Sequence, residues 1–162
     1  MNITTLEVQE LHRLTELYNY NDIDEMITEA TDEIQNNIID IFVLSNGAEL
    51  IGELHVRYQS DDDNFAIRGR RAYLFAFRVH KKYQGKGYGK YLIKEVIGML
   101  KEKGYSEFTI GIEDDNLIAH HIYHSLGFNK LLLRKKEEYQ GDSYEYNLYL
   151  MGQSTSSLQR TQ

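Results

Sequence analysis

The feature that most constrains this chain is the glycine-rich run Gln84-Gly85-Lys86-Gly87-Tyr88-Gly89-Lys90, which separates a predicted strand from a predicted helix. The strand is the apolar stretch 72–79, and the helix covers 91–103. Glycines let backbone N–H groups approach a ligand without Cβ clashes, and the first turn of a helix directs free N–H groups at an anion. Lys81, Lys82 and the two lysines of the run add positive charge. The run therefore predicts a loop that binds a phosphate-bearing ligand.

Two common phosphate loops do not fit this run. A P-loop requires G-x-x-x-x-G-K-[ST], whereas Lys90 is followed by Tyr91. A dinucleotide-binding loop requires G-x-G-x-x-G, whereas the glycines here follow the pattern G-x-G-x-G. The pattern that fits is Q-x-x-G-x-G, with Gln84, Gly87 and Gly89 at the named positions. It resembles the acyl-CoA pyrophosphate loop of the GNAT family of N-acetyltransferases, R/Q-x-x-G-x-G/A.

A second motif follows downstream, after a predicted strand over 107–112. It begins at Asn116, continues through Ala119 to Tyr123, and closes with Gly127-Phe128. Asn116 is well suited to cap a helix, and Tyr123 lies seven residues later, two turns along the same helical face. This is similar to the N-x-x-A-x-x-x-Y…GF signature of the same family. The two motifs carry the resemblance over residues 70–130.

Hydrophobic patterning predicts the remaining elements. It favours the order β-α-α-β-β-β-α-β-α-β-β, which agrees with the layout of the family. The resemblance thus implies an α/β (mixed α+β) fold with a central mixed, mostly antiparallel sheet and helices on both faces, as one domain over residues 1–150. The expected strands are 3–7, 38–44, 50–58, 72–79, 107–112, 128–136 and 143–150, and the expected helices are 10–18, 22–36, 91–103 and the one that starts at Asn116.

The resemblance also implies acetyl-CoA as co-substrate and assigns residues to it. The backbone of Arg78 and Val79 would bind the pantetheine arm in the manner of a strand, and Tyr123 would act as general acid toward the leaving thiolate. Asn116 would lie in line with the same ligand. The residues expected at the pyrophosphate are Gln84, Gly85, Lys86, Gly87, Tyr88, Gly89 and Lys90.

Composition excludes several classes of protein. The 162 residues include no cysteine, which excludes a disulfide scaffold, a thiolate metal site and a cysteinyl intermediate, so direct attack by the acceptor is the simplest route. A net charge of −7 argues against a nucleic-acid partner. No apolar run of membrane-spanning length and no signal peptide is present, so we expect no membrane partner and a cytoplasmic location. The polar segment 151–162 is expected to be a disordered tail.

The N-terminal third is strongly acidic. No lysine or arginine occurs between Arg13 and Arg57, while ten aspartates and glutamates do. One interpretation is a solvated acidic helical face; the other is a negative field that attracts a cationic amine. In the GNAT family the first two helices border the acceptor groove, which favours the second interpretation. The acceptor would then be a polyamine, an amine antibiotic or an amino-acid derivative, and a protein N-terminus or lysine stays open.

The general base is not identified by any motif. Histone-type relatives carry a glutamate on the central strand, where this chain has Tyr73. The candidates are Glu53 and His55, which share one face of a predicted strand, together with His80, Glu113 or a chain of waters. We expect no metal, because the histidines of the Asn116 helix (His120, His121 and His124) lack a plausibly spaced third ligand.

Two alternatives to the amine acetyltransferase stay open from sequence. The first is a non-catalytic acyl-CoA-binding module, and the second is acylation of a hydroxyl group. The apolar and aromatic segments 131–133 and 144–150 are in addition a candidate surface for a homodimer.

Overall fold

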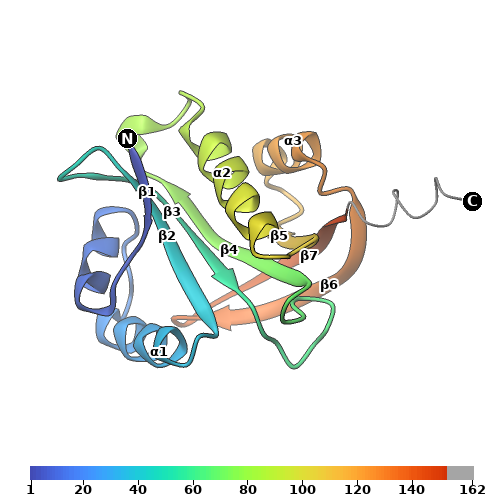
Figure 1. Ribbon diagram of the computed structural model, residues 1–162, viewed down its shortest axis with the longest axis horizontal. Helices are drawn as coiled ribbons and strands as arrows, with labels where there is room; N and C mark the ends of the chain where they lie inside the picture. Colours follow the sequence, from blue (N-terminus) through green and yellow to red (C-terminus); the bar gives the residue numbers. More distant parts are fainter. Residues whose placement is uncertain (153–162) are drawn as a thin grey trace, which may run out of the picture. The chain divides into compact units, whose positions relative to one another are not determined.

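The computed structural model describes residues 1–152 of the chain (Figure 1). Within them no helix is long and apolar enough to span a membrane. In chain order the elements are β1 (Asn2–Thr5), the 3₁₀ helix η1 (Val8–Glu16), α1 (Ile23–Gln35), β2 (Ile39–Ser45), β3 (Leu50–Arg57), β4 (Arg71–Val79), the 3₁₀ helix η2 (Lys81–Tyr83), α2 (Tyr88–Glu102), β5 (Glu107–Ile112), α3 (Leu117–Leu126), β6 (Lys130–Tyr139) and β7 (Asp142–Gly152).

The seven strands form one sheet in the order β1-β2-β3-β4-β5-β7-β6. β4 pairs with β5 in parallel, whereas β1 with β2, β2 with β3, β5 with β7 and β6 with β7 pair antiparallel. A parallel pair needs a crossover connection, and α2 provides it here. The mixed, mostly antiparallel sheet confirms the predicted fold class.

The chain divides into two compact units. Unit 1 consists of Met1–Arg57 and Phe75–Gly98, and unit 2 consists of Tyr58–Leu74 together with the chain from Met99 onward. The polypeptide passes between the units three times, and both β4 and α2 contribute residues to each of them.

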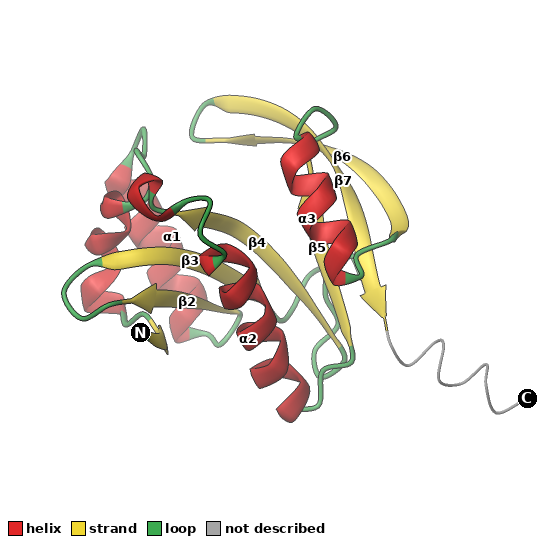
Figure 2. Cartoon of the chain, turned by 90° about the horizontal axis from the view of Figure 1, so that it is seen from above, coloured by secondary structure: helices red, strands yellow, loops and turns green. Residues whose placement is uncertain are grey.

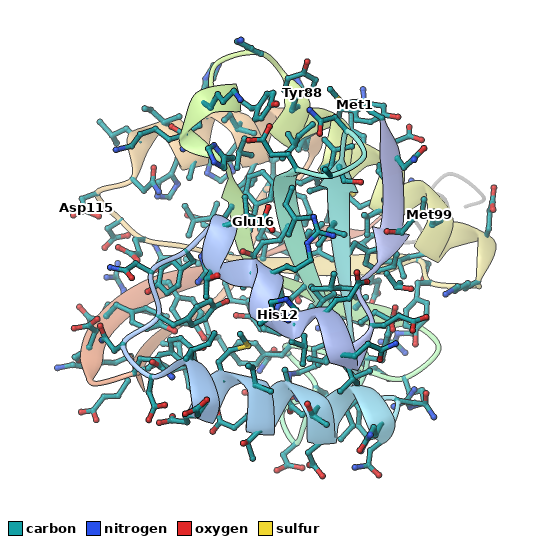
Figure 3. All side chains as sticks on the ribbon, turned by 90° about the vertical axis from the view of Figure 1, so that its left-hand side faces the viewer. Met1, His12, Glu16, Tyr88, Met99 and Asp115 are labelled. Carbon is teal, nitrogen blue, oxygen red and sulfur yellow. The ribbon has the colours of Figure 1, made fainter. Side chains whose placement is uncertain are left out.

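In unit 1, η1 and α1 cover one face of β2 and β3. Leu11 and Leu14 of η1 are completely buried and pack with Met26 and Ala30 of α1 on the strand residues Ile41 and Val43. Asp22 caps α1 by accepting a hydrogen bond from the N–H of Glu25 at 3.0 Å. Glu16, labelled at the end of η1 in Figure 3, accepts a hydrogen bond from the N–H of Leu50 at 3.1 Å. This contact ties η1 to the start of β3.

In unit 2, the strands β5, β6 and β7 pack with the loop before β4. Figure 2 shows β6 and β7 as a long curved hairpin. Phe65 of the loop packs on Tyr146 and Leu148 of β7. The Thr109 hydroxyl of β5 donates to the carbonyl of Phe65 at 2.7 Å in a buried position. This hydrogen bond replaces the one that the loop carbonyl would make with water in the unfolded chain.

Most predicted elements are present, with shifts at their ends. The first helix is a 3₁₀ helix, and the 3₁₀ turn η2 between β4 and the glycine run was not predicted. β7 continues to Gly152, so Met151 and Gly152, which we expected in the polar tail, belong to a strand because they pair with Phe108 and Glu107 of β5. The rest of the predicted tail, 153–162, lies outside the described residues.

β4 departs from simple alternation at Ala76. This residue has a φ of +49°, in the left-handed region that a residue with a Cβ rarely adopts. Phe75 packs with the core under η1 and α1, whereas Phe77 and Val79 lie against Gly89 of α2. Strict alternation along this strand would place Phe75, Phe77 and Val79 on one face. The irregular backbone at Ala76 instead separates Phe75 from the two residues that follow it.

Candidate functional site

The glycine run forms the predicted connection between strand and helix within unit 1. β4 ends at Val79, η2 makes a single turn, and α2 begins at Tyr88. Gly85 and Gly87 have φ values of +77° and +87°, which are strained for any residue with a side chain. The side-chain amide of Gln84 donates to the carbonyl of Val79 at 2.9 Å, so this glutamine holds the end of β4 against the start of the run.

The third glycine of the run has a different role, because it lies inside α2. A Cβ on Gly89 would lie 2.7 Å from Cζ of Phe77 and 3.1 Å from Cγ2 of Val79. Contacts below 3.0 Å are closer than two carbon atoms tolerate without movement. The absence of a side chain at Gly89 thus lets the first turn of α2 lie directly on the end of β4.

The first turn of α2 offers the chemical groups that bind an anion. The carbonyl of Gly87 accepts from the N–H of Tyr91 at 3.1 Å, and the N–H groups of Tyr88, Gly89 and Lys90 precede this first helical bond. No acidic side chain lies in the first turn, and Lys86 and Lys90 are exposed beside it. Free N–H groups, the positive end of the helix and two lysines suit a pyrophosphate.

A hydrogen-bonded cluster attaches η2 to the β2–β3 hairpin. The Tyr83 hydroxyl donates to Oε1 of Glu49 at 2.7 Å and accepts from the side-chain amide of Asn46 at 3.0 Å. The ammonium group of Lys82 lies 3.4 Å from the same Glu49 oxygen. The hydrogen bond from Tyr83 lowers the pKa of Glu49, and the carboxylate in turn raises the pKa of Tyr83. The turn that leads into the glycine run is thereby fixed to a neighbouring hairpin.

In unit 2, α3 carries the two residues of the second motif. The Asn116 side chain accepts from the N–H of Ala119 at 3.0 Å, which confirms its predicted role as helix cap. Gly127 ends the helix with a φ of +110°. Tyr123 is buried, and this burial raises the pKa of its hydroxyl. A tyrosine with an ordinary pKa already carries its proton at neutral pH, and burial shifts this phenol further in the same direction.

Two histidines of α3 form a chain between two backbone carbonyls. His120 contacts the carbonyl of Glu113 through Nε2 (3.1 Å) and Nε2 of His124 through Nδ1 (3.2 Å), and Nδ1 of His124 contacts the carbonyl of Phe128 (2.7 Å). Each of these three contacts needs one N–H hydrogen. Two neutral imidazoles carry only two, so one of the three contacts lacks a hydrogen when both rings are neutral. Both histidines are thus engaged with each other and with the backbone. Among residues 1–152, no group of three or more His, Cys, Asp and Glu side chains could hold a metal ion.

A buried polar cluster lies on the face of β3 that packs under η1 and α1. Glu53 is completely buried and His55 is 7% exposed; they pair across the strands with Val43 and Ile41 of that core. Oε1 of Glu53 lies 2.6 Å from Nε2 of His55. Oε2 of Glu53 is also buried, and no residue in the described part of the chain donates a hydrogen bond to it.

Arg78 of β4 and two tyrosines complete this cluster. The guanidinium of Arg78 lies 3.5 Å from Oε1 of Glu53 and 3.7 Å from the ring centre of Tyr18. It also donates to the hydroxyl of Tyr20 at 3.4 Å. The two tyrosines come from the η1–α1 connection. Our sequence analysis placed Tyr18 at the end of the helix expected over 10–18 and named neither tyrosine as a site residue. The one signal available was a pair of aromatic residues within an otherwise polar stretch.

The other candidate bases have different surroundings. Nδ1 of His80 accepts from the N–H of Lys82 at 3.1 Å and caps η2. Glu113 is exposed, and Tyr73 packs against Phe65 in unit 2. The structure thus brings two of the candidates, Glu53 and His55, into one hydrogen-bonded pair. Of the predicted site residues, Arg78, Val79 and the run 84–90 belong to unit 1, and Asn116 and Tyr123 belong to unit 2.

The chain is similar to several known proteins. The profile of the acetyltransferase (GNAT) family matches residues 6–128. The ribosomal protein bS18-alanine N-acetyltransferase of Haemophilus ducreyi is 32% identical over 103 residues, which cover 60% of this chain and 71% of that protein. The structure of a spermidine N-acetyltransferase variant from Vibrio cholerae superposes with a TM-score of 0.72 at 19% identity, over 100% of both chains. A putative acetyltransferase from Salmonella typhimurium, solved with its cofactor acetyl-CoA, gives a TM-score of 0.69 at 20% identity, over 94% of this chain and 93% of that one.

Proposed function

Because this chain belongs to the acetyltransferase (GNAT) family, we propose that it transfers the acetyl group of acetyl-CoA directly to the primary amine of a cationic small molecule. The observation that carries the proposal is the start of α2, where free N–H groups, glycines with positive φ and lysines meet without an acidic side chain. Direct transfer is the simplest route because the chain has no cysteine to form a thioester intermediate.

In this proposal the amine nitrogen attacks the carbonyl carbon of the thioester and the C–S bond breaks. The sulfur leaves with the bonding electron pair and takes the hydroxyl proton of Tyr123, and the proton that the nitrogen loses as it becomes an amide restores this hydroxyl through solvent. The phenol carries its proton at neutral pH, so it can donate that proton or a hydrogen bond to the sulfur as the thiolate forms. By the family resemblance, the backbone of Arg78 and Val79 would hold the pantetheine arm, the residues 84–90 would hold the pyrophosphate, and the side chain of Asn116 would bind the same cofactor.

The acidic character of the N-terminal third supports a cationic acceptor such as a polyamine, an amine antibiotic or an amino-acid derivative. A negative field raises the local concentration of a cation and the rate of its encounter. The spermidine N-acetyltransferase among the structural neighbours is named for a polyamine of this kind. The relative from Haemophilus ducreyi is named for a ribosomal protein, so a protein N-terminus is the second candidate acceptor.

The experiment that tests the proposal measures CoA release from acetyl-CoA with a thiol reagent. The panel of acceptors would contain polyamines, aminoglycosides, amino acids and a peptide with an N-terminal alanine, and an alcohol would test acylation of a hydroxyl group. The protein contributes no thiol background, because it has no cysteine. Release with the small cations and not with the peptide supports the proposed class. Binding of acetyl-CoA without release from any acceptor would favour a binding module instead.

We further propose a cytoplasmic homodimer. Leu131 of β6 is 56% exposed, and β6 is the last strand of the sheet. An edge strand with an exposed apolar side chain is suited to pair with a second copy. A monomeric mass by light scattering would contradict the dimer, and recovery in the membrane fraction of lysed cells would contradict the location.

A further inference from the structure

The buried carboxylate of Glu53 requires an explanation that packing does not provide. Burying a charged group costs several kcal/mol unless it is paired and hydrogen-bonded. One oxygen of Glu53 is shared between His55 and Arg78, while the other accepts nothing from residues 1–152. The neighbouring positions on this face are filled by Ile41 and Val43. An apolar residue would pack at least as well at position 53, which points to a chemical role.

The hydrogen bond between Glu53 and His55 assigns the tautomer of the imidazole. An ionised carboxylate only accepts, so Nε2 of His55, at 2.6 Å, carries the hydrogen and donates it. The neutral ring then has its lone pair on Nδ1. An imidazolium that forms at this position is stabilised by the adjacent carboxylate, as in other base–carboxylate pairs.

His55 lies beside the part of β4 to which we assign the acyl donor. Its ring contacts the ring of Phe75 with centroids 5.3 Å apart, and Phe75 directly precedes the irregular residue Ala76. A Cβ on Gly52 of β3 would lie 3.1 Å from the carbonyl oxygen of Arg78, so β3 runs alongside β4 up to the proposed pantetheine site. The imidazole is therefore on the strand next to β4, beside Phe75 and three residues along β3 from the position that faces Arg78.

We propose that Nδ1 of His55, directly or through one water, takes a proton from the ammonium group of the acceptor, and that Glu53 is the positioning residue for this base. The proposal rests on the proposed amine acetyltransfer. An ammonium nitrogen has no lone pair, so it must lose one proton before it attacks the thioester carbon. That proton forms imidazolium on His55, beside the Glu53 carboxylate, and then passes to solvent. Arg78, stacked on Tyr18, keeps the carboxylate in place.

If His55 is the base, its loss should affect some acceptors more than others, whereas the loss of a purely structural histidine should affect all acceptors alike. Removing the base should lower kcat/KM only for acceptors that bind in their protonated form. The test therefore compares two acceptors of the same enzyme: the preferred amine, which is largely ammonium at the assay pH, and a weakly basic analogue that is largely neutral. The variants are H55Q and E53Q, and H12Q is the matched control, because His12 is an exposed histidine of the same unit.

For H55Q we expect kcat/KM with the ammonium acceptor to fall by about 10²-fold or more, which is the contribution usual for general base catalysis. With the neutral acceptor it should change by only a few-fold. The deficit should shrink as the pH rises, because solvent then deprotonates the amine. E53Q should show the same pattern with a smaller loss, and H12Q should match the parent with both acceptors.

The outcomes separate this inference from the proposed function. If the parent protein binds acetyl-CoA but acetylates no amine, the proposed function fails. If the parent is active and H55Q loses equally with both acceptors, or loses with neither, the role of His55 as base is overturned. Circular dichroism and melting temperature would establish that H55Q folds. Should it not fold, the same comparison with E53Q decides: a selective loss supports the proposal, and an equal loss or no loss overturns it.

Discussion

Two glycines of α2 should respond to alanine in opposite directions. Gly98 is exposed, and a Cβ there would meet no atom within 4 Å. Alanine is favoured over glycine in a helix by about 1 kcal/mol, so Gly98→Ala should raise the free energy of unfolding by about 0.5–1 kcal/mol. Gly89→Ala gains at most the same helical preference. Its Cβ, however, would lie 2.7 Å from Phe77 and 3.1 Å from Val79.

The cost at Gly89 can be bounded from these contacts. Overpacking by a methyl group costs about 1–3 kcal/mol, and the ring of Phe77 can relieve part of the clash because Cζ is its outermost atom. After the gain in helix preference is subtracted, we expect a net loss of about 1 kcal/mol. The two alanine variants should thus differ by about 2 kcal/mol.

Urea unfolding followed by circular dichroism measures both variants against the parent. A double-mutant cycle with Phe77→Leu adds a second test, because removing the ring should cancel much of the loss at Gly89. A stabilising Gly89→Ala would refute the close approach of α2 to β4. So would a Gly89→Ala loss that Phe77→Leu leaves unchanged.

Three further predictions address the candidate site. Tyr123→Phe should lower kcat more than it raises KM for acetyl-CoA, and an unchanged kcat in the variant would remove Tyr123 as the acid. Because burial raises the pKa of Tyr123, the parent should show no loss of kcat from ionisation of this group below pH 10. Tyr83→Phe should raise KM for acetyl-CoA several-fold by releasing η2 from Glu49, and an unchanged KM would show that this contact does not order the loop. Asn116→Ala should lower the free energy of unfolding by about 1 kcal/mol through loss of the cap, and Asn116→Asp, which keeps an acceptor, should not.

The elements with strong local signals were predictable from sequence. Asn116 was recognised as the cap of α3, and the structure confirms it. The helix predicted over 91–103 ends at Glu102, shortly before Gly104 with its φ of +100°. The helix expected over 91–103 corresponds to α2, in which Leu92, Val96 and Leu100 recur at helical spacing and are buried. These features depend on residues close in the chain, and such interactions are visible in a single sequence.

The features that sequence did not predict depend on contacts between distant segments. Nothing in the sequence around Ala76 indicates a left-handed residue in a strand, because alanine carries a Cβ and rarely adopts that region. The alternation of β3 correctly placed Glu53 and His55 on one face, but it could not show that this face is buried. Tyr18 and Arg78 are 60 positions apart in the chain, so their stacking follows only from the fold.

The division of the chain into interleaved units has a consequence for synthesis on the ribosome. During synthesis residues 1–57 emerge before residues 75–98, and unit 1 needs both segments. The intervening segment 58–74 is translated before unit 1 is complete. It belongs to unit 2, whose other segment begins only at Met99. Neither unit is therefore a contiguous piece that could be produced alone by truncation. The nascent protein completes its first unit while it already carries an unassembled part of the second.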